Sequence, residues 1–144
     1  MPKTRREFVT DSGEATIALG RQLAAGISAP RLLLLIGRLG TGKTTLAKGI
    51  ISGLGAAGEE EVTSPTFTLV HEFGRSPKVF HVDLYRVDTP REIATLGLED
   101  LWQQPAVVLI EWGEKFPGLF TGPRWELHLE DLGNDRRRIL LEEY

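Results

Sequence analysis

The spacing of apolar residues changes along the chain, and each spacing predicts a different element. Over residues 13–27 an apolar residue returns at every fourth position, which is typical of an amphipathic helix. The unbroken apolar runs at 32–36 and 106–110 are typical of short strands covered on both faces. A second helix is expected over 43–54, because glycines surround its last apolar position.

Turn-forming residues divide the rest of the chain. The glycine and proline at 74–77, and the Leu-Gly-Asn-Asp segment at 132–135, each predict a hairpin turn between two strands. Thr89 followed by Pro90 predicts the start of a short helix, with Thr89 as its N-cap and Pro90 as its first residue. These signals predict strands at 67–73, 78–85, 125–129 and 137–141, and a helix at 90–96.

A glycine-rich segment lies between the strand at 32–36 and the helix at 43–54. Residues 37–44 read Gly-Arg-Leu-Gly-Thr-Gly-Lys-Thr and match the phosphate-loop pattern G-x-x-x-x-G-K-[ST] without a mismatch. Glycines let successive backbone amides converge on phosphate oxygens, and the following helix adds its positive N-terminal end. Lys43 would follow the β and γ phosphates, and the Thr44 hydroxyl would be a ligand for Mg²⁺.

The sequence also bears on the nucleotide base. Guanine-specific switch GTPases usually carry an Asn-Lys-x-Asp clamp, but the single asparagine of this chain, Asn134, is followed by Asp135 and Arg136. The absence of the clamp favours ATP, or a site with weak base selectivity.

A phosphate loop needs an acidic group at the end of a neighbouring apolar strand to hold Mg²⁺ or its water shell. Glu111 follows the apolar run 107–110, and Asp83 follows a similar run that His81 interrupts. We assign Glu111 to the metal and Asp83 to positioning or deprotonating the attacking water. The alternative for each carboxylate is a polar residue that leaves the sheet into solvent, and the phosphate loop favours the functional interpretation.

The predicted elements together define an α/β fold. We expect one P-loop NTPase-type domain over residues 1–144, with a central mixed sheet, parallel and antiparallel, flanked by helices. The length fits this expectation, since one domain takes about 150 residues. The chain has no cysteine, which excludes disulfides, thiol catalysis and cysteine metal sites.

Net charge and hydropathy limit the classes of partner and the compartment that the sequence favours. Seventeen Lys and Arg against 20 Asp and Glu give a net charge of −3, so no overall cationic field attracts DNA or RNA. No apolar run is longer than the one at 32–36, which is far too short to span a bilayer, and no apolar signal segment follows the basic first residues. We therefore expect a cytoplasmic protein with no membrane contact.

Several other residues have both a structural and a functional interpretation. The segment 63–67, with hydroxyls flanking Pro65, fits an ordinary strand-entry turn as well as a switch-like contact to the γ phosphate. Trp112 would be a packing anchor or a partner contact. The run 136–138, three arginines near acidic residues, favours cross-strand ion pairs or a solvated surface over an RNA patch. The histidines lack metal-ligand spacing and are interpreted as structural; they are His71, His81 and His128.

Four motifs, in their order and spacing, resemble the TsaE (YjeE) family of ATPases. They are GRLGTGKTT at 37–45, SPTF at 64–67, HVDLYR at 81–86 and IEW at 110–112. The phosphate loop alone marks a very large superfamily, whereas the other three motifs are far more specific. The resemblance runs from the first helix to the final hairpin, which is essentially the whole chain.

The resemblance implies a small bacterial ATPase that needs Mg²⁺ and ATP. It implies a role in forming threonylcarbamoyladenosine at position 37 of tRNAs that read ANN codons. The implied partner is the complex of TsaD with TsaB, which transfers the threonylcarbamoyl group. ATP hydrolysis by the family member would support the cycling of that complex. We expect tRNA contact mainly through that complex, and no DNA partner.

The same resemblance implies roles for individual residues. Thr44 and Glu111 would hold Mg²⁺, and Lys43 and Asp83 would be catalytic. Thr66 would be catalytic and switch-like, and Trp112 would lie near the nucleotide or at the interface. The implied phosphate-binding residues are Gly40, Thr41, Gly42, Lys43, Thr44 and Thr45.

Two other functions stay open on the sequence alone. A small-molecule kinase begins with the same loop, but kinases usually add an arginine-bearing lid helix. Residues 59–85 predict a loop and a hairpin, which leaves little chain for a lid. A nucleotide-gated binding module without meaningful turnover would carry the same motifs. Phosphate transfer to a small acceptor would favour the kinase. Slow turnover alone and faster turnover with TsaB and TsaD would favour the ATPase over the binding module.

Overall fold

The computed structural model describes residues 1–144, apart from the side chain of Trp102. The strands are β1 (Thr4–Thr10), β2 (Arg31–Ile36), β3 (Val70–Phe73), β4 (Lys78–Asp83), β5 (Ala106–Glu111), β6 (Trp125–Gly133) and β7 (Arg136–Glu143). The helices are α1 (Gly13–Ala24), α2 (Lys43–Gly53), α3 (Pro90–Thr95) and α4 (Leu98–Trp102), with 3-10 turns η1 (Glu59–Glu61) and η2 (Gly113–Lys115).

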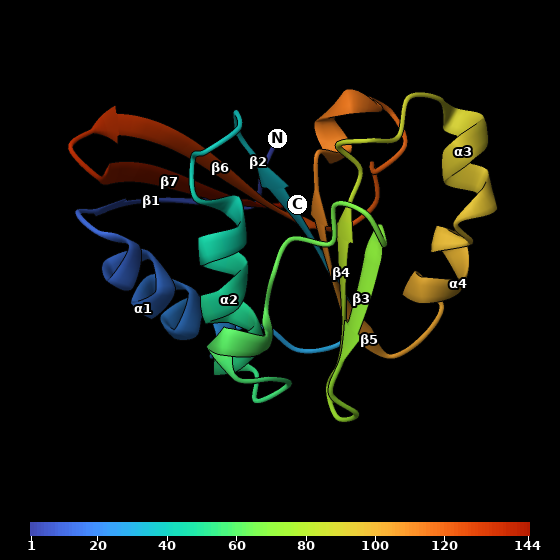
Figure 1. Cartoon of the computed structure of the whole chain (residues 1–144), viewed down its shortest axis with the longest axis horizontal. Coiled ribbons are helices and arrows are strands. Elements are labelled where there is room, and N and C mark those ends of the chain that lie inside the picture. The colour runs from blue at the N-terminus through green and yellow to red at the C-terminus, as the bar shows by residue number, and fades with distance from the viewer.

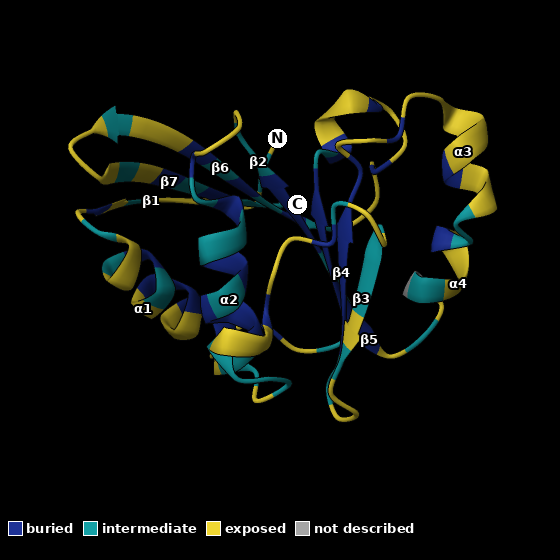
Figure 2. Ribbon diagram, in the orientation of Figure 1, coloured by how far each residue is buried: buried dark blue, intermediate teal, exposed yellow. Residues whose placement is uncertain are grey.

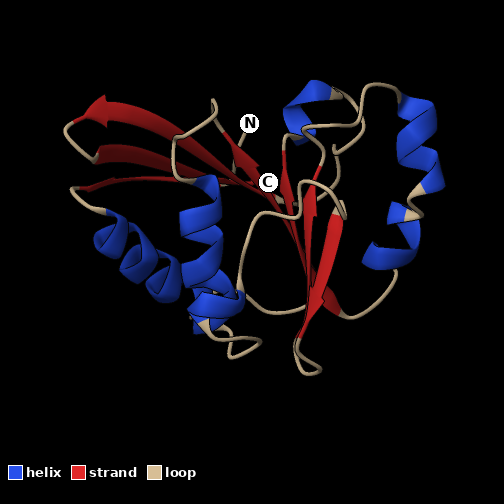
Figure 3. Cartoon of the chain, viewed as in Figure 1, coloured by secondary structure: helices blue, strands red, loops and turns tan.

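The strands form one sheet in the order β1-β7-β6-β2-β5-β4-β3 (Figure 1; Figure 3). The central strand β2 runs parallel to β5 and β6, and β4 runs parallel to β5. The outer pairs β1–β7, β6–β7 and β3–β4 are antiparallel. The predicted α/β fold with a mixed sheet flanked by helices is therefore confirmed.

Helices lie on both sides of the sheet (Figure 1). On one face, apolar residues of α1 and α2 such as Leu23 and Ile50 pack with Leu33 and Leu109 of the central strands. On the other face, α3, α4 and the segment after η2 cover β4 and β5 in a second apolar cluster. Figure 2 shows that the central strands β2, β4 and β5 are largely buried, as unbroken apolar runs predict.

Helices α1 and α2 cross at two glycines. A Cβ at Gly20 would lie 2.6 Å from the carbonyl oxygen of Leu46, and a Cβ at Gly49 would collide with the carbonyl oxygen of Ile17. The backbones therefore approach so closely that neither position has room for a side chain. This contact fixes α2, and with it the glycine-rich loop that precedes α2, against the sheet.

The N-terminal strand β1 was not predicted. Its sequence, Thr-Arg-Arg-Glu-Phe-Val-Thr, lacks apolar alternation, and Phe8 is its one large apolar side chain that packs against the core. Backbone pairing with β7, from Thr4 opposite Glu143 to Thr10 opposite Arg137, holds it at the sheet edge. An edge strand can be charged on most positions because water solvates its side chains.

Other boundaries differ from the predictions for local reasons. The first helix ends at Ala24 and not at 27. Strand β3 begins at Val70, because Leu69 has a positive φ of 69° and its amide donates to the Pro65 carbonyl in a turn. The helix α4 was not predicted. The cap at Thr89 is as predicted, since its hydroxyl accepts from the Glu92 amide.

The last hairpin turns at Asn134 and Asp135, which have φ values of 54° and 62°. Two left-handed residues form the tight turn that matches strand twist, so β6 and β7 extend further than the predicted segments. Across this hairpin Arg137 pairs with Asp131 at 2.9 Å, and Arg138 pairs with Glu130 at 3.1 Å. The predicted cross-strand ion pairs are therefore present.

The same topology fixes where chemistry can occur. Because β2, β4 and β5 are parallel, their carboxyl ends lie at one edge of the sheet, which is where open α/β sheets bind ligands.

None of the helices in the described chain combines the length and the apolar character needed to cross a membrane.

Candidate nucleotide-binding site

The glycine-rich loop joins the end of β2 to the start of α2. Gly40 and Gly42 have φ values of 79° and 99°, and Gly42 caps α2. These are conformations that glycine adopts at little cost. A Cβ at Gly37 would lie 2.7 Å from Thr41 Oγ1 and 2.8 Å from the Leu129 carbonyl. The loop therefore curls tightly over the N-terminus of an eleven-residue helix, as an anion-binding loop requires.

Lys43 is buried at the start of α2, with 5% of its surface exposed. Its ammonium donates to the Gly37 carbonyl at 2.7 Å and lies 3.3 Å from the ring centroid of Trp112. The lysine is thus folded back on its own loop, with a cation–π contact on the other side.

The environment of Lys43 shifts its protonation. Burial lowers the pKa of Lys43 below the ordinary lysine value of 10.5. The carboxylates of Glu114, Glu111 and Asp83 act in the opposite direction, Glu114 most strongly. The loss of hydration therefore lowers the pKa of Lys43 by more than the three nearby carboxylates raise it.

Thr44 faces a carboxylate at the end of β5. Its hydroxyl donates to Glu111 Oε2 at 3.1 Å and lies 3.3 Å from Oε1. Glu111 is buried, with 3% of its surface exposed. The hydroxyl and carboxylate oxygens form an all-oxygen donor set, which is the kind that Mg²⁺ takes, so these two residues fit the metal assigned to them.

Asp83 lies at the end of β4, directly opposite Glu111 in the strand register. Its Oδ2 accepts from Ser64 at 2.8 Å and from Thr66 at 3.3 Å, and its Oδ1 accepts from the Tyr85 amide at 2.8 Å. The structure thereby brings the SPTF segment to the acidic strand end. Ser64, to which the sequence analysis assigned no role of its own, is the closer hydroxyl.

These residues surround one cavity of about 450 Å³. Five of the six residues expected to bind phosphate line it, and Thr41 does not, because its hydroxyl donates to the Arg38 carbonyl at 2.8 Å. The cavity is lined by Leu39, Gly40, Gly42, Lys43, Thr44, Thr45, Ser64, Thr66, Asp83, Tyr85, Glu111, Trp112 and Arg137.

Trp112 continues β5 into η2 in a left-handed conformation, with φ 67° and ψ 22°. Such a backbone costs a large residue about 1–3 kcal/mol, and residues strained in this way cluster at ligand and switch sites. Its ring lies 5.1 Å from the Tyr85 ring, centroid to centroid. Trp112 therefore forms part of the cavity wall, and it also packs against the second apolar cluster.

Two polar neighbours of the site were missed. His81 was interpreted as structural, yet its Nε2 lies 2.6 Å from Glu111 Oε2. The signal was available, because His81 and Asp83 are two residues apart on a strand and share a face. Arg137 carries a second cation to the cavity, and only the fold, which places β7 beside the phosphate loop, reveals it.

The other two histidines lie elsewhere. The His71 ring contacts Phe73 edge-on at 6.1 Å. His128 Nε2 lies 3.0 Å from Glu126 and 3.2 Å from Glu142, so these three side chains form a group with metal-ligand character that spacing did not reveal. Arg124, 2.7 Å from Glu126, and Arg5, 3.8 Å from Glu142, offset both carboxylates. This group therefore has no excess negative charge to attract a cation.

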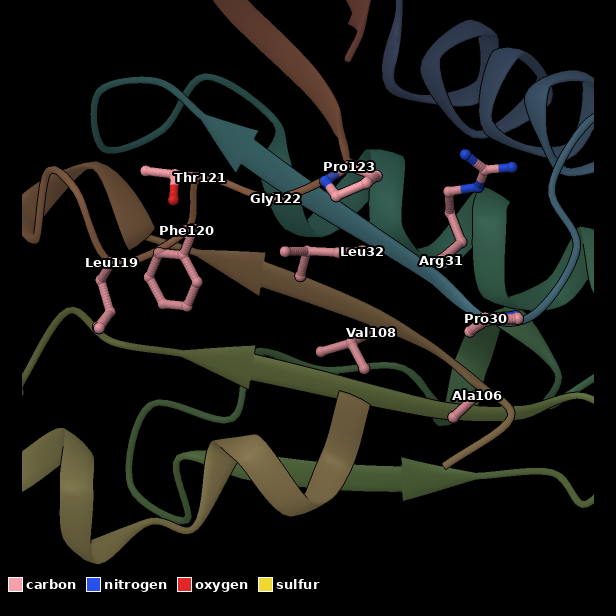
Figure 4. A pocket seen from close by; sticks show the side chains of 10 residues that line it. All are labelled: Pro30, Arg31, Leu32, Ala106, Val108, Leu119, Phe120, Thr121, Gly122 and Pro123. Carbon is pink, nitrogen blue, oxygen red and sulfur yellow. The ribbon is translucent and has the colours of Figure 1, made fainter. Parts of the chain in front are cut away.

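A second cavity, of about 350 Å³, lies over β2 and β5 on the face opposite α2 (Figure 4). Leu32, Val108 and Phe120 line it, and Figure 4 shows the Arg31 guanidinium directed away from them. The Arg31 guanidinium lies 5.7 Å from the centroid of the Trp125 ring. The lining is mostly apolar, and its polar side chains, Arg31 and Thr121, include no carboxylate or imidazole that could hold a metal.

The glycine loop between a parallel strand and a helix, with Lys43 and Thr44 facing an acidic strand end, defines a P-loop α/β protein. A family model described as "Threonylcarbamoyl adenosine biosynthesis protein TsaE" matches residues 10–139. The chain belongs to the TsaE family, and so to the proteins of tRNA threonylcarbamoyladenosine biosynthesis. The family predicted from the four motifs is confirmed.

Relatives agree with this assignment along most of the chain. The tRNA threonylcarbamoyladenosine biosynthesis protein TsaE of Nostoc sp. is 43% identical over 116 residues, which cover 76% of this chain and 68% of that protein. The protein of the same name from Synechocystis sp. is 39% identical, over 83% of this chain and 77% of its own length. The crystal structure of Bacillus subtilis YdiB superposes with a TM-score of 0.78 at 28% identity, covering 97% of this chain and 86% of that one.

Proposed function

We propose that this protein is a Mg²⁺-dependent ATPase of the cytoplasm. It would act with the TsaD–TsaB complex in forming the threonylcarbamoyl group on adenosine 37 of tRNAs that read ANN codons. The observation that carries the proposal is the meeting of Lys43, Thr44 and Glu111 in one cavity at the phosphate loop. The family membership supports the pathway.

The loop supplies the affinity for the triphosphate. Backbone amides after Gly40 and the N-terminus of α2 would hold the phosphate oxygens, together with Thr45. Lys43 would leave the Gly37 carbonyl and place its ammonium on the β and γ phosphates. Thr44 and Glu111 would hold Mg²⁺, which when bound neutralises charge that develops on the phosphate oxygens.

Asp83 is the group best placed to act on water. Its carboxylate lies beside Glu111 in the register, and it is already held by hydroxyls of Ser64 and Thr66. We assign it the orientation or deprotonation of the attacking water, which makes it catalytic, with Thr66 as the switch-like residue that follows the γ phosphate. An Asp83 bound by three donors is fixed in orientation before nucleotide arrives.

Contact with tRNA would come mainly through the partner complex. The net charge is −3, and the basic run at the end of the chain is engaged in ion pairs of Arg137 and Arg138 with acidic residues. Pairing of Arg137 and Arg138 with acidic side chains reduces the positive charge that a phosphate-tracking surface would need. The docking partner is therefore expected to supply the RNA-binding charge.

The kinase alternative loses support from the fold. Between α2 and the end of β4 the chain forms η1, a loop and the β3–β4 hairpin, with no α-helix. No arginine-bearing lid helix therefore occupies this segment, where a kinase would be expected to enclose a second substrate.

The decisive experiment is reconstitution of tRNA modification with TsaD, TsaB and this protein. Multiple turnover should fail without this protein and with Lys43→Ala, because charge compensation at the β and γ phosphates is lost. ATP hydrolysis should be slow for the isolated chain and faster with TsaD and TsaB. Calorimetry that detects no binding of ATP or ADP to the folded protein with Mg²⁺ would contradict the proposal.

A nucleotide-gated binding module would behave differently in the same assay. It would support modification with a non-hydrolysable ATP analogue as well as with ATP. Equal numbers of modification cycles with the two nucleotides would therefore favour the module over the ATPase.

A further inference from the structure

His81 is a fully buried polar side chain to which the proposed phosphate chemistry gives no role. It lies on β4 with 0% of its surface exposed. Its partner in the register is Leu109 of β5, two residues before Glu111, so the imidazole and the Glu111 carboxylate share one face of the sheet. That face is the one against which α2 packs.

The imidazole donates to Glu111. His81 Nε2 lies 2.6 Å from Glu111 Oε2, whereas Nδ1 has no hydrogen-bond partner among the described residues. A proton on Nδ1 would be a buried, unpaired N–H, so the favoured tautomer of the neutral ring carries its proton on Nε2. The result is a short hydrogen bond from a rigid donor to a charged acceptor.

Glu111 is thereby held from two sides. Its Oε2 accepts from His81 and, at 3.1 Å, from Thr44. The two donors come from different elements, β4 and α2, so they fix the plane of the carboxylate and direct it toward the Thr44 hydroxyl. A carboxylate that binds a metal depends on such outer contacts, and losing one typically costs about 10–100-fold in metal affinity.

We propose that His81 is a positioning residue that acts through Glu111 and keeps this carboxylate aligned for the divalent metal that accompanies the nucleotide. The inference rests on the proposed nucleotide function. A positioning role for His81 differs from a packing role in what it requires of the side chain. Packing needs a side chain of suitable size, whereas positioning needs a hydrogen-bond donor at the place that Nε2 occupies.

Three substitutions separate these roles. His81→Gln keeps an amide donor near the position of Nε2, His81→Asn carries the same amide one methylene short of Glu111, and His81→Leu has the size without a donor. The readout is calorimetry with a non-hydrolysable ATP analogue, once with Mg²⁺ and once with EDTA. His71→Leu, at the neighbouring register position on β3, is the matched control.

Affinity in EDTA should be unchanged in all variants. The gain in affinity on adding Mg²⁺ should fall about 10–100-fold in His81→Asn and His81→Leu, and it should be largely restored in His81→Gln. His71→Leu should keep the wild-type gain. In a Glu111→Gln background, His81→Asn should have no further effect on this gain, since the residue through which it acts is already changed.

Several results would overturn the assignment. They are an unchanged Mg²⁺ gain in His81→Asn, an equal loss in the Gln and Asn variants, an equal loss with and without Mg²⁺, or failure of both amide variants to fold. If His81→Leu alone fails to fold, the comparison of Gln with Asn decides. A wild-type protein that binds no nucleotide contradicts the proposed function instead, so the two failures are distinct.

Discussion

The ammonium of Lys43 lies 3.3 Å from the ring centroid of Trp112, while it donates to the Gly37 carbonyl at 2.7 Å. The lysine that the phosphate loop provides for its ligand is therefore engaged on two sides before a ligand arrives. A triphosphate must draw the ammonium away from the Gly37 carbonyl, and this movement changes the environment of the Trp112 indole.

The first prediction uses this contact as a reporter. Adding ADP and Mg²⁺ should shift the Trp112 emission to shorter wavelength, because the ligand covers an indole that lines the cavity. Trp112→Phe should lack the shift and keep nucleotide binding, since a ring remains over Lys43. The other two tryptophans of the chain, Trp102 and Trp125, supply the residual signal in that variant. An undiminished shift in Trp112→Phe would contradict the assignment.

The second prediction separates the two carboxylates. Glu111→Gln should reduce the Mg²⁺-dependent part of nucleotide affinity by about tenfold or more, equivalent to about 1.4 kcal/mol. Asp83→Asn should leave nucleotide affinity close to wild type and lower turnover by about 10²–10⁴-fold, as expected for a group acting on water. Calorimetry and phosphate release measure the two effects. Equal loss of binding in both variants would reject the division of roles.

The third prediction concerns protonation of the free protein. Lysine-selective NMR titration should give Lys43 a pKa below 10.5, because burial disfavours the ammonium. Glu114→Gln should lower this pKa further, since Glu114 is the carboxylate that raises it most. A pKa for Lys43 at or above 10.5 would contradict this account.

The sign of the effect on stability follows from the same shift. Between the lowered pKa and 10.5 the unfolded chain binds more protons at this lysine than the folded chain. The contribution of Lys43 to the free energy of unfolding therefore rises with pH in that window. Denaturation of Lys43→Met over the same window should lack this rise.

The fourth prediction concerns the contact of α1 with α2. Gly49→Ala should destabilise the protein by about 1–3 kcal/mol, because its Cβ collides with the Ile17 carbonyl and helix backbones cannot yield locally. Gly13→Ala, at the first residue of α1 with open space around it, should be neutral or stabilising by up to about 1 kcal/mol. Urea denaturation of both variants provides the comparison. Similar free energies of unfolding for the two would contradict the close approach.

Local patterns were sufficient for the centre of the fold. Unbroken apolar runs identified β2 and β5, and the motif between β2 and α2 placed Lys43 and Thr44 at a helix N-terminus. Glu111 and Asp83 could be predicted as neighbours because parallel strands end at a common edge. These features follow from spacing within single segments, together with the general rule that parallel strands end at one edge of a sheet.

Contacts between distant segments could not be predicted in the same way. Strand β1 is held by backbone pairing with β7, and backbone pairing requires no particular pattern of side chains in the sequence of β1. Arg137 reaches the cavity because the last strand passes the phosphate loop, a fact of topology and not of its local sequence. The sequence places His81 on the same face as Asp83, but its hydrogen bond to Glu111 also depends on the register of β4 against β5.

The pairing of β1 with β7 has a practical consequence for handling this protein. Thr4 lies opposite Glu143, so a tag at either end would emerge from the same corner of the molecule. Trimming the chain to the start of the family match at residue 10 would strip the cover from β7. The bare backbone amides and carbonyls of β7 would then be a template for joining two molecules edge to edge, and aggregation of such a shortened protein is the expected cost.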